Sequence, residues 1–224
     1  RFGDYASPQY GTIKSSENYE RRFIMTFPNE TLPKGRKQKT TALYDRFVNQ
    51  GAVMGDSFGL ENVLWFANNK EDAHEEPTIK RSRSHDYVSK EVQNVRENVG
   101  AIEVANFSKH EFKGPDARKF LDYILAGKLP KKGRISLSPM LTYRGKLYGD
   151  LTVACLDENE FMIFGSGAAQ EMHRRWFESH ISKFNVKYLN RSDDFHGISI
   201  AGPKSRDLLQ KLVREDVSND NFKF

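Results

Sequence analysis

Cysteine is almost absent from this sequence, since Cys155 is the only one among 224 residues. A single cysteine excludes an intrachain disulfide and a cysteine-rich metal site. The six histidines are scattered without the regular spacing of a metal site, so we assign no metal. His173 and His180 could share a helix face, and beside Arg174 and Arg175 we expect that face to be exposed. This composition is typical of a protein in a reducing compartment.

Long hydrophobic runs are also missing. The longest, residues 63–67 and 161–164, are far shorter than the ~18–20 residues that a membrane helix requires. We therefore expect no membrane span. With 38% hydrophobic and 29% charged residues, the chain is nevertheless able to bury a core, and we expect a globular protein.

No segment carries a strong excess of one charge. Lys and Arg number 35 against 30 Asp and Glu, and residues 1–67 contain nine basic and seven acidic side chains. An evenly spread excess does not indicate a nucleic-acid-binding arm. The sequence pI of about 9.1 still leaves open a non-catalytic module that binds RNA or a partner protein. Its basic loops would be residues 34–39, 80–83 and 128–134.

The composition divides the chain into two parts. Residues 1–67 are rich in glycine and proline and predict a turn-rich segment. Residues 68–83 are charged and nearly free of large apolar side chains, which predicts a linker. We therefore place domains at 1–67 and 68–224. Because the chain starts at Arg1 without an initiator methionine, we expect a piece of a longer polypeptide.

Helices alternate with hairpins in the second part, which predicts an α+β domain. Valines at the helical period predict a helix over residues 88–99 that faces a core. A second helix is expected over 168–180. Strands are expected around 102–107 and over 136–141, 147–155 and 161–164, with 136–141 and 147–155 joined as a hairpin.

Two Gly-Pro pairs suggest an internal duplication. Gly114-Pro115 and Gly202-Pro203 each open a helix with an apolar face, and proline is tolerated at the first helical position. Because a Gly-Pro helix start is common, these two matches by themselves leave duplication open.

Asp150 is the candidate catalytic carboxylate. It lies between Gly149 and an apolar strand that enters the core, so we expect its side chain to be partly desolvated. Its charged form would then need a partner, such as an N–H group of a ligand. From spacing alone, a cap on a turn or an ion pair with Lys146 remains the simpler explanation.

The turn Gly165-Ser166-Gly167 lies between a predicted strand and a predicted helix. It weakly resembles a phosphate-binding glycine turn, but Gln170 stands where the third glycine would be. A turn of small residues between strand and helix is the preferred interpretation.

One longer run, residues 133–153, carries a family resemblance. Its sequence is Gly-Arg-Ile-Ser-Leu-Ser-Pro-Met-Leu-Thr-Tyr-Arg-Gly-Lys-Leu-Tyr-Gly-Asp-Leu-Thr-Val. It resembles the folate-binding domain of the dimethylglycine and sarcosine dehydrogenases, which is itself similar to aminomethyltransferase, the T-protein of the glycine cleavage system. Residues 160–163 and 200–206 resemble later parts of that domain. Residues 1–67 resemble the segment between the FAD domain and the folate domain of these enzymes.

The resemblance implies a duplicated, antiparallel-sheet-and-helix folate-binding domain of the aminomethyltransferase type, incomplete at its C-terminus. It further implies an oxidoreductase whose FAD domain, outside this chain, oxidises an N-methylated glycine, while this region captures the one-carbon unit on tetrahydrofolate. The partners would be that methylated substrate and the FAD domain of the same polypeptide, with no nucleic acid and no membrane. The location would be the cytoplasm in bacteria or the mitochondrial matrix in eukaryotes.

The resemblance also assigns site residues by position. Asp150 matches the carboxylate that contacts the folate amine nitrogens and assists their attack on the one-carbon unit, because it can accept the proton that the amine loses. Phe107, Leu137 and Ser166 match positions that line the pterin pocket. Aminomethyltransferases usually have tyrosine at the position of Leu137 and often asparagine at that of Ser166. The glycine turn at 165–167 is then expected to line the pocket.

Overall fold

The computed structural model describes residues 7–28 and 30–222. By their internal contacts these residues form two compact units. Unit 1 contains the described residues up to Val104 and from Gly197 onward, and unit 2 is Ala105–His196. This division does not test the sequence boundary between residues 67 and 68, which stays a prediction. Among the described residues, no helix is long and apolar enough to cross a membrane.

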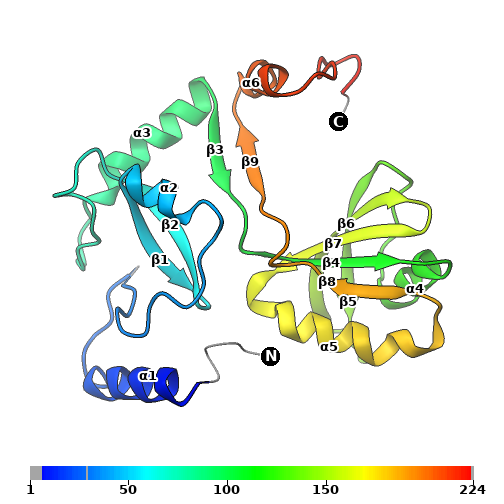
Figure 1. The fold of residues 1–224 in the computed structure, drawn as a ribbon, viewed down its shortest axis with the longest axis horizontal. Helices are drawn as coiled ribbons and strands as arrows, with labels where there is room; N and C mark the ends of the chain where they lie inside the picture. Colours follow the sequence, from blue (N-terminus) through cyan, green and yellow to red (C-terminus); the bar gives the residue numbers. More distant parts are fainter. Residues whose placement is uncertain (1–6, 29, 223–224) are drawn as a thin grey trace. The chain divides into compact units, whose positions relative to one another are not determined.

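Unit 2 is built on a five-stranded antiparallel sheet, which confirms the predicted α+β class (Figure 1). The strands lie in the order β5 (Ile135–Leu141), β6 (Leu147–Asp157), β7 (Glu160–Ser166), β4 (Phe107–Lys113) and β8 (Lys187–Asn190). The helices are α4 (Ala117–Ile124) and α5 (Gln170–His180), with single 3₁₀ turns η2 (Gly167–Ala169) and η3 (Ile181–Lys183). The predicted hairpin is the β5–β6 pair, and Gly145 at φ +69° allows its tight turn.

The core of unit 2 lies on one face of this sheet. The Phe112 ring of β4 lies 5.5 Å from Phe120 of α4 and 5.0 Å from Phe177 of α5, so both helices cover the same face. All three rings are fully buried. The opposite face is open at its β5 edge, where Ile135 and Leu137 are 67% and 71% exposed. Any site on the open face is therefore accessible to ligands.

Unit 1 contains more regular structure than its glycines and prolines predict. It includes α1 (Pro8–Glu20), α2 (Tyr44–Asn49), the hairpin β1 (Ala52–Ser57) and β2 (Leu60–Phe66), α3 (Ser84–Glu97), the pair β3 (Gly100–Glu103) and β9 (Ile198–Ala201), and α6 (Ser205–Leu212). The predicted strand at 102–107 is wrong in its bounds, because a turn separates β3 from β4.

Helix α1 and the β1–β2 hairpin add regular structure to the turn-rich segment predicted at residues 1–67, within the part of that segment that the structure describes. Pro8 begins α1 at a tolerated position, and the Ser7 hydroxyl caps it by accepting the Tyr10 N–H at 3.1 Å. The hairpin turns at Phe58 and Gly59, where φ is positive and the Asp56 carboxylate accepts the Gly59 N–H.

Helix α3 contacts the small core of the β1–β2 hairpin through Tyr87, whose ring lies 4.9 Å from that of Trp65, and not through the valines that predicted a core-facing helix. Val88 and Val92 are 36% and 47% exposed, and no residue of the helix is fully buried. The periodicity correctly predicts a helix with an apolar stripe, but a stripe is buried only where another element lies against it.

The two Gly-Pro helix starts share one hydrogen-bond arrangement, which supports the predicted duplication. Gly114 and Gly202 have φ of +145° and +121°, and a Cβ on either would lie about 2.5 Å from a carbonyl oxygen, that of Asn185 or Asn98. In each case the residue two positions later donates its backbone N–H to that same oxygen, at 3.2 and 2.9 Å. Both positions therefore require glycine.

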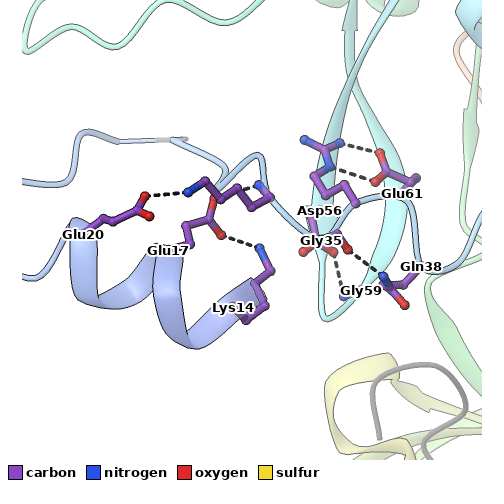
Figure 2. A network of polar contacts seen from close by, with 10 residues as sticks. Lys14, Glu17, Glu20, Gly35, Gln38, Asp56, Gly59 and Glu61 are labelled. Carbon is purple, nitrogen blue, oxygen red and sulfur yellow. Dashed lines mark hydrogen bonds and ion pairs between the residues drawn. The ribbon is translucent and has the colours of Figure 1, made fainter. Parts of the chain in front are cut away.

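Two buried carboxylates hold the loops of unit 1, as Figure 2 shows. Glu17 of α1 accepts hydrogen bonds from the Lys14 ammonium at 2.8 Å and the Lys34 backbone N–H at 2.7 Å. Burial alone would raise the pKa of Glu17, but these bonds outweigh it and lower the pKa. The carboxylate of Glu61 on β2 accepts hydrogen bonds from Nε and Nη2 of Arg36. The same Nη2 also donates to the Met54 carbonyl oxygen at 3.1 Å.

Replacing Arg36 with methionine should destabilise unit 1 strongly. Glu61 is 2% exposed, so the substitution leaves its charge buried without its partner, at a cost of about 3–5 kcal/mol in the free energy of unfolding. The measurement is urea unfolding of this chain. Lys34→Met is the matched control, because Lys34 and Glu20 form an exposed ion pair that contributes little. Equal effects of the two substitutions would contradict this account.

Candidate functional site

A cavity of about 270 Å³ opens on the uncovered face of the unit 2 sheet. Its walls come from the start of β4, the middle of β6, the end of β7 and the turn after β7. This volume is near the lower end for ligand pockets and suits one flat ring system. The lining residues are Asn106, Phe107, Asp150, Thr152, Phe164, Gly165, Ser166 and Gly167.

The alternation of β6 places Asp150 at this cavity. Leu151, Val153 and Cys155 point to the core and are at most 1% exposed, so Asp150 and Thr152 lie on the open face. The Asp150 side chain is exposed, and the prediction that it is partly desolvated is wrong. Asp150 does precede a buried strand segment, but adjacent residues of a strand face opposite sides of the sheet.

The Asp150 carboxylate makes no polar contact in the described part of the chain. No hydrogen bond to it and no ion pair with Lys146 occurs there, so neither simple structural explanation applies. An ionised carboxylate accepts up to about four hydrogen bonds. Asp150 therefore has its full accepting capacity available to a ligand.

Strand register brings three of the four predicted site residues to one cavity. Phe107 lies opposite Ser166 in the β4–β7 pair, and Asp150 lines the same cavity from β6. Leu137 is not a lining residue. It lies beside the cavity, because it is the direct β5 partner of Thr152, which does line it.

The cavity floor is thin because two glycines allow a side chain to approach the sheet from beneath. A Cβ on Gly149 would lie 2.8 Å from His173 Nε2, and a Cβ on Gly165 would lie 3.0 Å from His173 Nδ1. His173 comes from α5 and is 2% exposed, so the expectation that it lies on an exposed helix face is wrong. Its ring contacts the backbone just before Asp150 and Ser166.

A second buried histidine lies next to His173. The ring centroids of His110 and His173 are 6.3 Å apart, and His110 Nδ1 lies 2.8 Å from the Tyr188 hydroxyl. Burial, with a smaller contribution from His173, lowers the pKa of His110 to about 3. Burial likewise lowers the pKa of His173 and raises that of Tyr188. Both histidines are therefore neutral at physiological pH.

Comparison with known proteins assigns this architecture to a family. The family described as GCVT N-terminal domain matches residues 43–224. The chain belongs to the GCVT N-terminal domain family. The crystal structure of the glycine cleavage system aminomethyltransferase T from Bartonella henselae shares its fold, with a TM-score of 0.62 and 21% identity over 78% of this chain and 43% of that one.

Two relatives that match nearly the whole chain are larger proteins. The mouse mitochondrial dimethylglycine dehydrogenase is 34% identical over the whole of this chain. The human mitochondrial sarcosine dehydrogenase is 26% identical over 97% of it. This GCVT chain spans 26% and 28% of their lengths. The resemblance seen in the sequence is confirmed, together with the aminomethyltransferase-like fold.

Several lining residues of the cavity are absent from the sequence predictions. Thr152 and Phe164 could have been found, because they lie two positions from Asp150 and Ser166 on the same strands. Asn106 and Gly167 could not, since a tertiary contact brings them together: a Cβ on Gly167 would lie 2.0 Å from the Asn106 carbonyl oxygen. Among the described residues, no three His, Cys, Asp or Glu side chains could hold a metal ion.

Unit 2 should lose stability in mild acid because of His110. With a folded pKa of about 3 and an ordinary unfolded value, the unfolded chain binds a proton below about pH 6.5 that the folded chain rejects. The contribution of His110 to stability is therefore complete well above pH 6.5 and falls as the pH drops, by about 2 kcal/mol at pH 5.

The measurement compares the free energy of unfolding at pH 7.5 and pH 5.0. His110→Gln should show a smaller loss on acidification than the original chain. His85→Gln, which changes an exposed histidine of unit 1, should retain the full loss. An unchanged loss in His110→Gln would contradict the assigned neutral state.

Proposed function

We propose that this chain is the folate-binding region of an FAD-dependent N-methylglycine dehydrogenase, where it captures a one-carbon unit on tetrahydrofolate. The observation that carries the proposal is the Asp150 carboxylate, which lines a ligand-sized cavity and has no partner in the described chain. Similarity to dimethylglycine dehydrogenase along the entire chain supports it. The chain covers only a quarter of that relative, so the oxidation itself belongs to residues outside these 224.

The cavity residues fit a reduced pterin. Phe107 and Phe164 provide aromatic surface for a flat ring, and Asp150 provides acceptors for its N–H groups. Tetrahydrofolate supplies amine nitrogens that can bond to a one-carbon unit.

Asp150 performs three tasks in this proposal. Its oxygens accept N–H hydrogen bonds, which orients the amine, and one oxygen takes up the proton that the amine releases. The negative charge also stabilises positive charge that develops beside it. Because Asp150 is exposed before binding, the ligand itself must exclude water to strengthen these interactions.

The proposal also covers the FAD domain, the segment that connects it to this region, the role of Leu137 and the location in the cell. An FAD domain of the same polypeptide would oxidise the methylated glycine, and residues 1–67 would connect it to the folate-binding region at 68–224. Leu137 would contact the ligand where it leaves the cavity, since Leu137 is 71% exposed beside Thr152. The location would be the mitochondrial matrix or the bacterial cytoplasm; the names of the eukaryotic relatives describe those proteins as mitochondrial.

The alternative of an RNA-binding module has less support. Each of its basic loops is partly neutralised by ion pairs: Arg36 pairs with Glu61, Arg83 with Asp72, and Lys132 with Asp157. A phosphate would have to compete with these carboxylates, which weakens the electrostatic attraction on which such binding depends.

Asp150→Asn should weaken binding of tetrahydrofolate to this chain by about tenfold or more, because the amide removes the charge and one acceptor. The measurement is a calorimetric titration. Asp157→Asn is the matched control, since Asp157 lies on the same strand but is paired with Lys132. It should leave the affinity unchanged.

Two results would contradict the proposal. Equal affinities of Asp150→Asn and the original chain would remove Asp150 from the site. Absence of binding to the original chain, and to a longer polypeptide that includes it, would overturn the folate assignment.

A further inference from the structure

Lys109 is a buried lysine on β4 that does not line the cavity. Only 4% of it is exposed. Its Nζ donates hydrogen bonds to the backbone oxygens of Phe107 at 2.8 Å and Ala105 at 3.1 Å, and it lies 3.5 Å from that of Ser192. Burying an ammonium group is costly unless polar groups replace its water. These carbonyl oxygens take the place of that water.

The oxygens bound by Lys109 belong to a cavity wall. Ala105 and Phe107 flank Asn106, and both Asn106 and Phe107 line the cavity. The intervening carbonyl oxygen, that of Asn106, lies against Gly167, where a Cβ would come within 2.0 Å of it. The ammonium group therefore holds the carbonyl groups on both sides of Asn106, and the Asn106 carbonyl itself lies close to the glycine turn.

Lys109 is itself firmly anchored. Its backbone N–H donates to the Ser192 hydroxyl at 2.9 Å, and its carbonyl accepts the Arg191 N–H at 2.8 Å. Ser192 is 9% exposed and in turn donates to Asn190 at 2.6 Å. The wall is thus tied through Lys109 to the segment that follows β8.

Packing alone does not explain a lysine here. Methionine has a similar length and carries no charge that must be desolvated. A lysine at this position is favourable only if the contacts of its ammonium group outweigh the cost of removing that group from water. Two of these contacts are the hydrogen bonds to the carbonyl oxygens of Ala105 and Phe107.

We infer that Lys109 is a positioning residue for the ligand cavity, which holds the turn at 105–107 so that the Phe107 ring stays in the orientation that receives the ligand. The inference rests on the proposed function for the identity of the ligand, but the rigidity of the turn is independent of it. Lys109 acts through Phe107 and does not touch the ligand.

The first test uses hydrogen exchange of this chain without ligand. Lys109→Met should speed exchange of the amides at 105–108 by about tenfold, while peptides from β6 and β7 keep their rates. Lys113→Met is the matched control on the same strand, since Lys113 is exposed and pairs with Glu160. Unchanged exchange at 105–108, or an equal increase throughout unit 2, would overturn the inference.

If Lys109→Met does not fold, Lys109→Gln replaces it in this test. Glutamine keeps two N–H donors but reaches less far, so exchange at 105–108 should increase by a smaller factor. The same two contrary results would overturn the inference for this variant.

The second test is a double-mutant cycle on tetrahydrofolate affinity. Lys109→Met should weaken binding about tenfold in the original chain and have almost no effect in Phe107→Ala, because the ring through which it acts is gone. Additive effects would show a structural role only and overturn the inference. Loss of all folate binding in the original chain would instead contradict the proposed function, and hydrogen exchange would still decide the role of Lys109.

Discussion

Strand β6 can bury only one of its two faces, and the rest of unit 2 is arranged around that constraint. Leu151, Val153 and Cys155 form part of the core beneath α4 and α5. Asp150 and Thr152 must then lie on the open face. The neighbouring strands β5 and β7 pair with β6 in register, so each of them also has one face toward the core and one face away from it. The face turned away from the core is the one on which the cavity opens.

The two faces of the sheet are closest to each other at the glycines of β6 and β7. At Gly149 and Gly165 no side chain separates the cavity floor from His173, which lies beneath the sheet. The position of α5 is therefore linked to the position of Asp150 and Ser166. A substitution that enlarges either glycine would move the helix or the cavity floor, and one that charges His173 would place a cation in the core below the site.

Much of the fold follows from local sequence patterns. The β5–β6 hairpin, α5 and the two Gly-Pro helices were predicted close to their observed bounds, because alternation and glycine-proline pairs act over a few residues. Strands β8 and β9 were missed, since each has only four residues and depends on a partner distant in sequence. Helix α1 was missed because its polar sequence has almost no apolar periodicity.

The site was predictable only in part. Family resemblance placed Asp150, Phe107 and Ser166, and the structure brings these three to one cavity while it leaves Leu137 beside it. Residue patterns alone misjudged the burial of Asp150 and His173, because burial depends on which face of an element is covered. The burial of Lys109 could not be predicted from the sequence, because the backbone carbonyl groups around its ammonium group are brought there by the fold.

The most direct test of the central claim measures the products of the complete polypeptide that contains this chain, supplied with a methylated glycine and tetrahydrofolate. The claim is that Asp150 serves one-carbon capture and not amine oxidation. Asp150→Asn should therefore oxidise the amine at the original rate and release free formaldehyde in place of methylene-tetrahydrofolate. An unchanged yield of methylene-tetrahydrofolate would contradict the account.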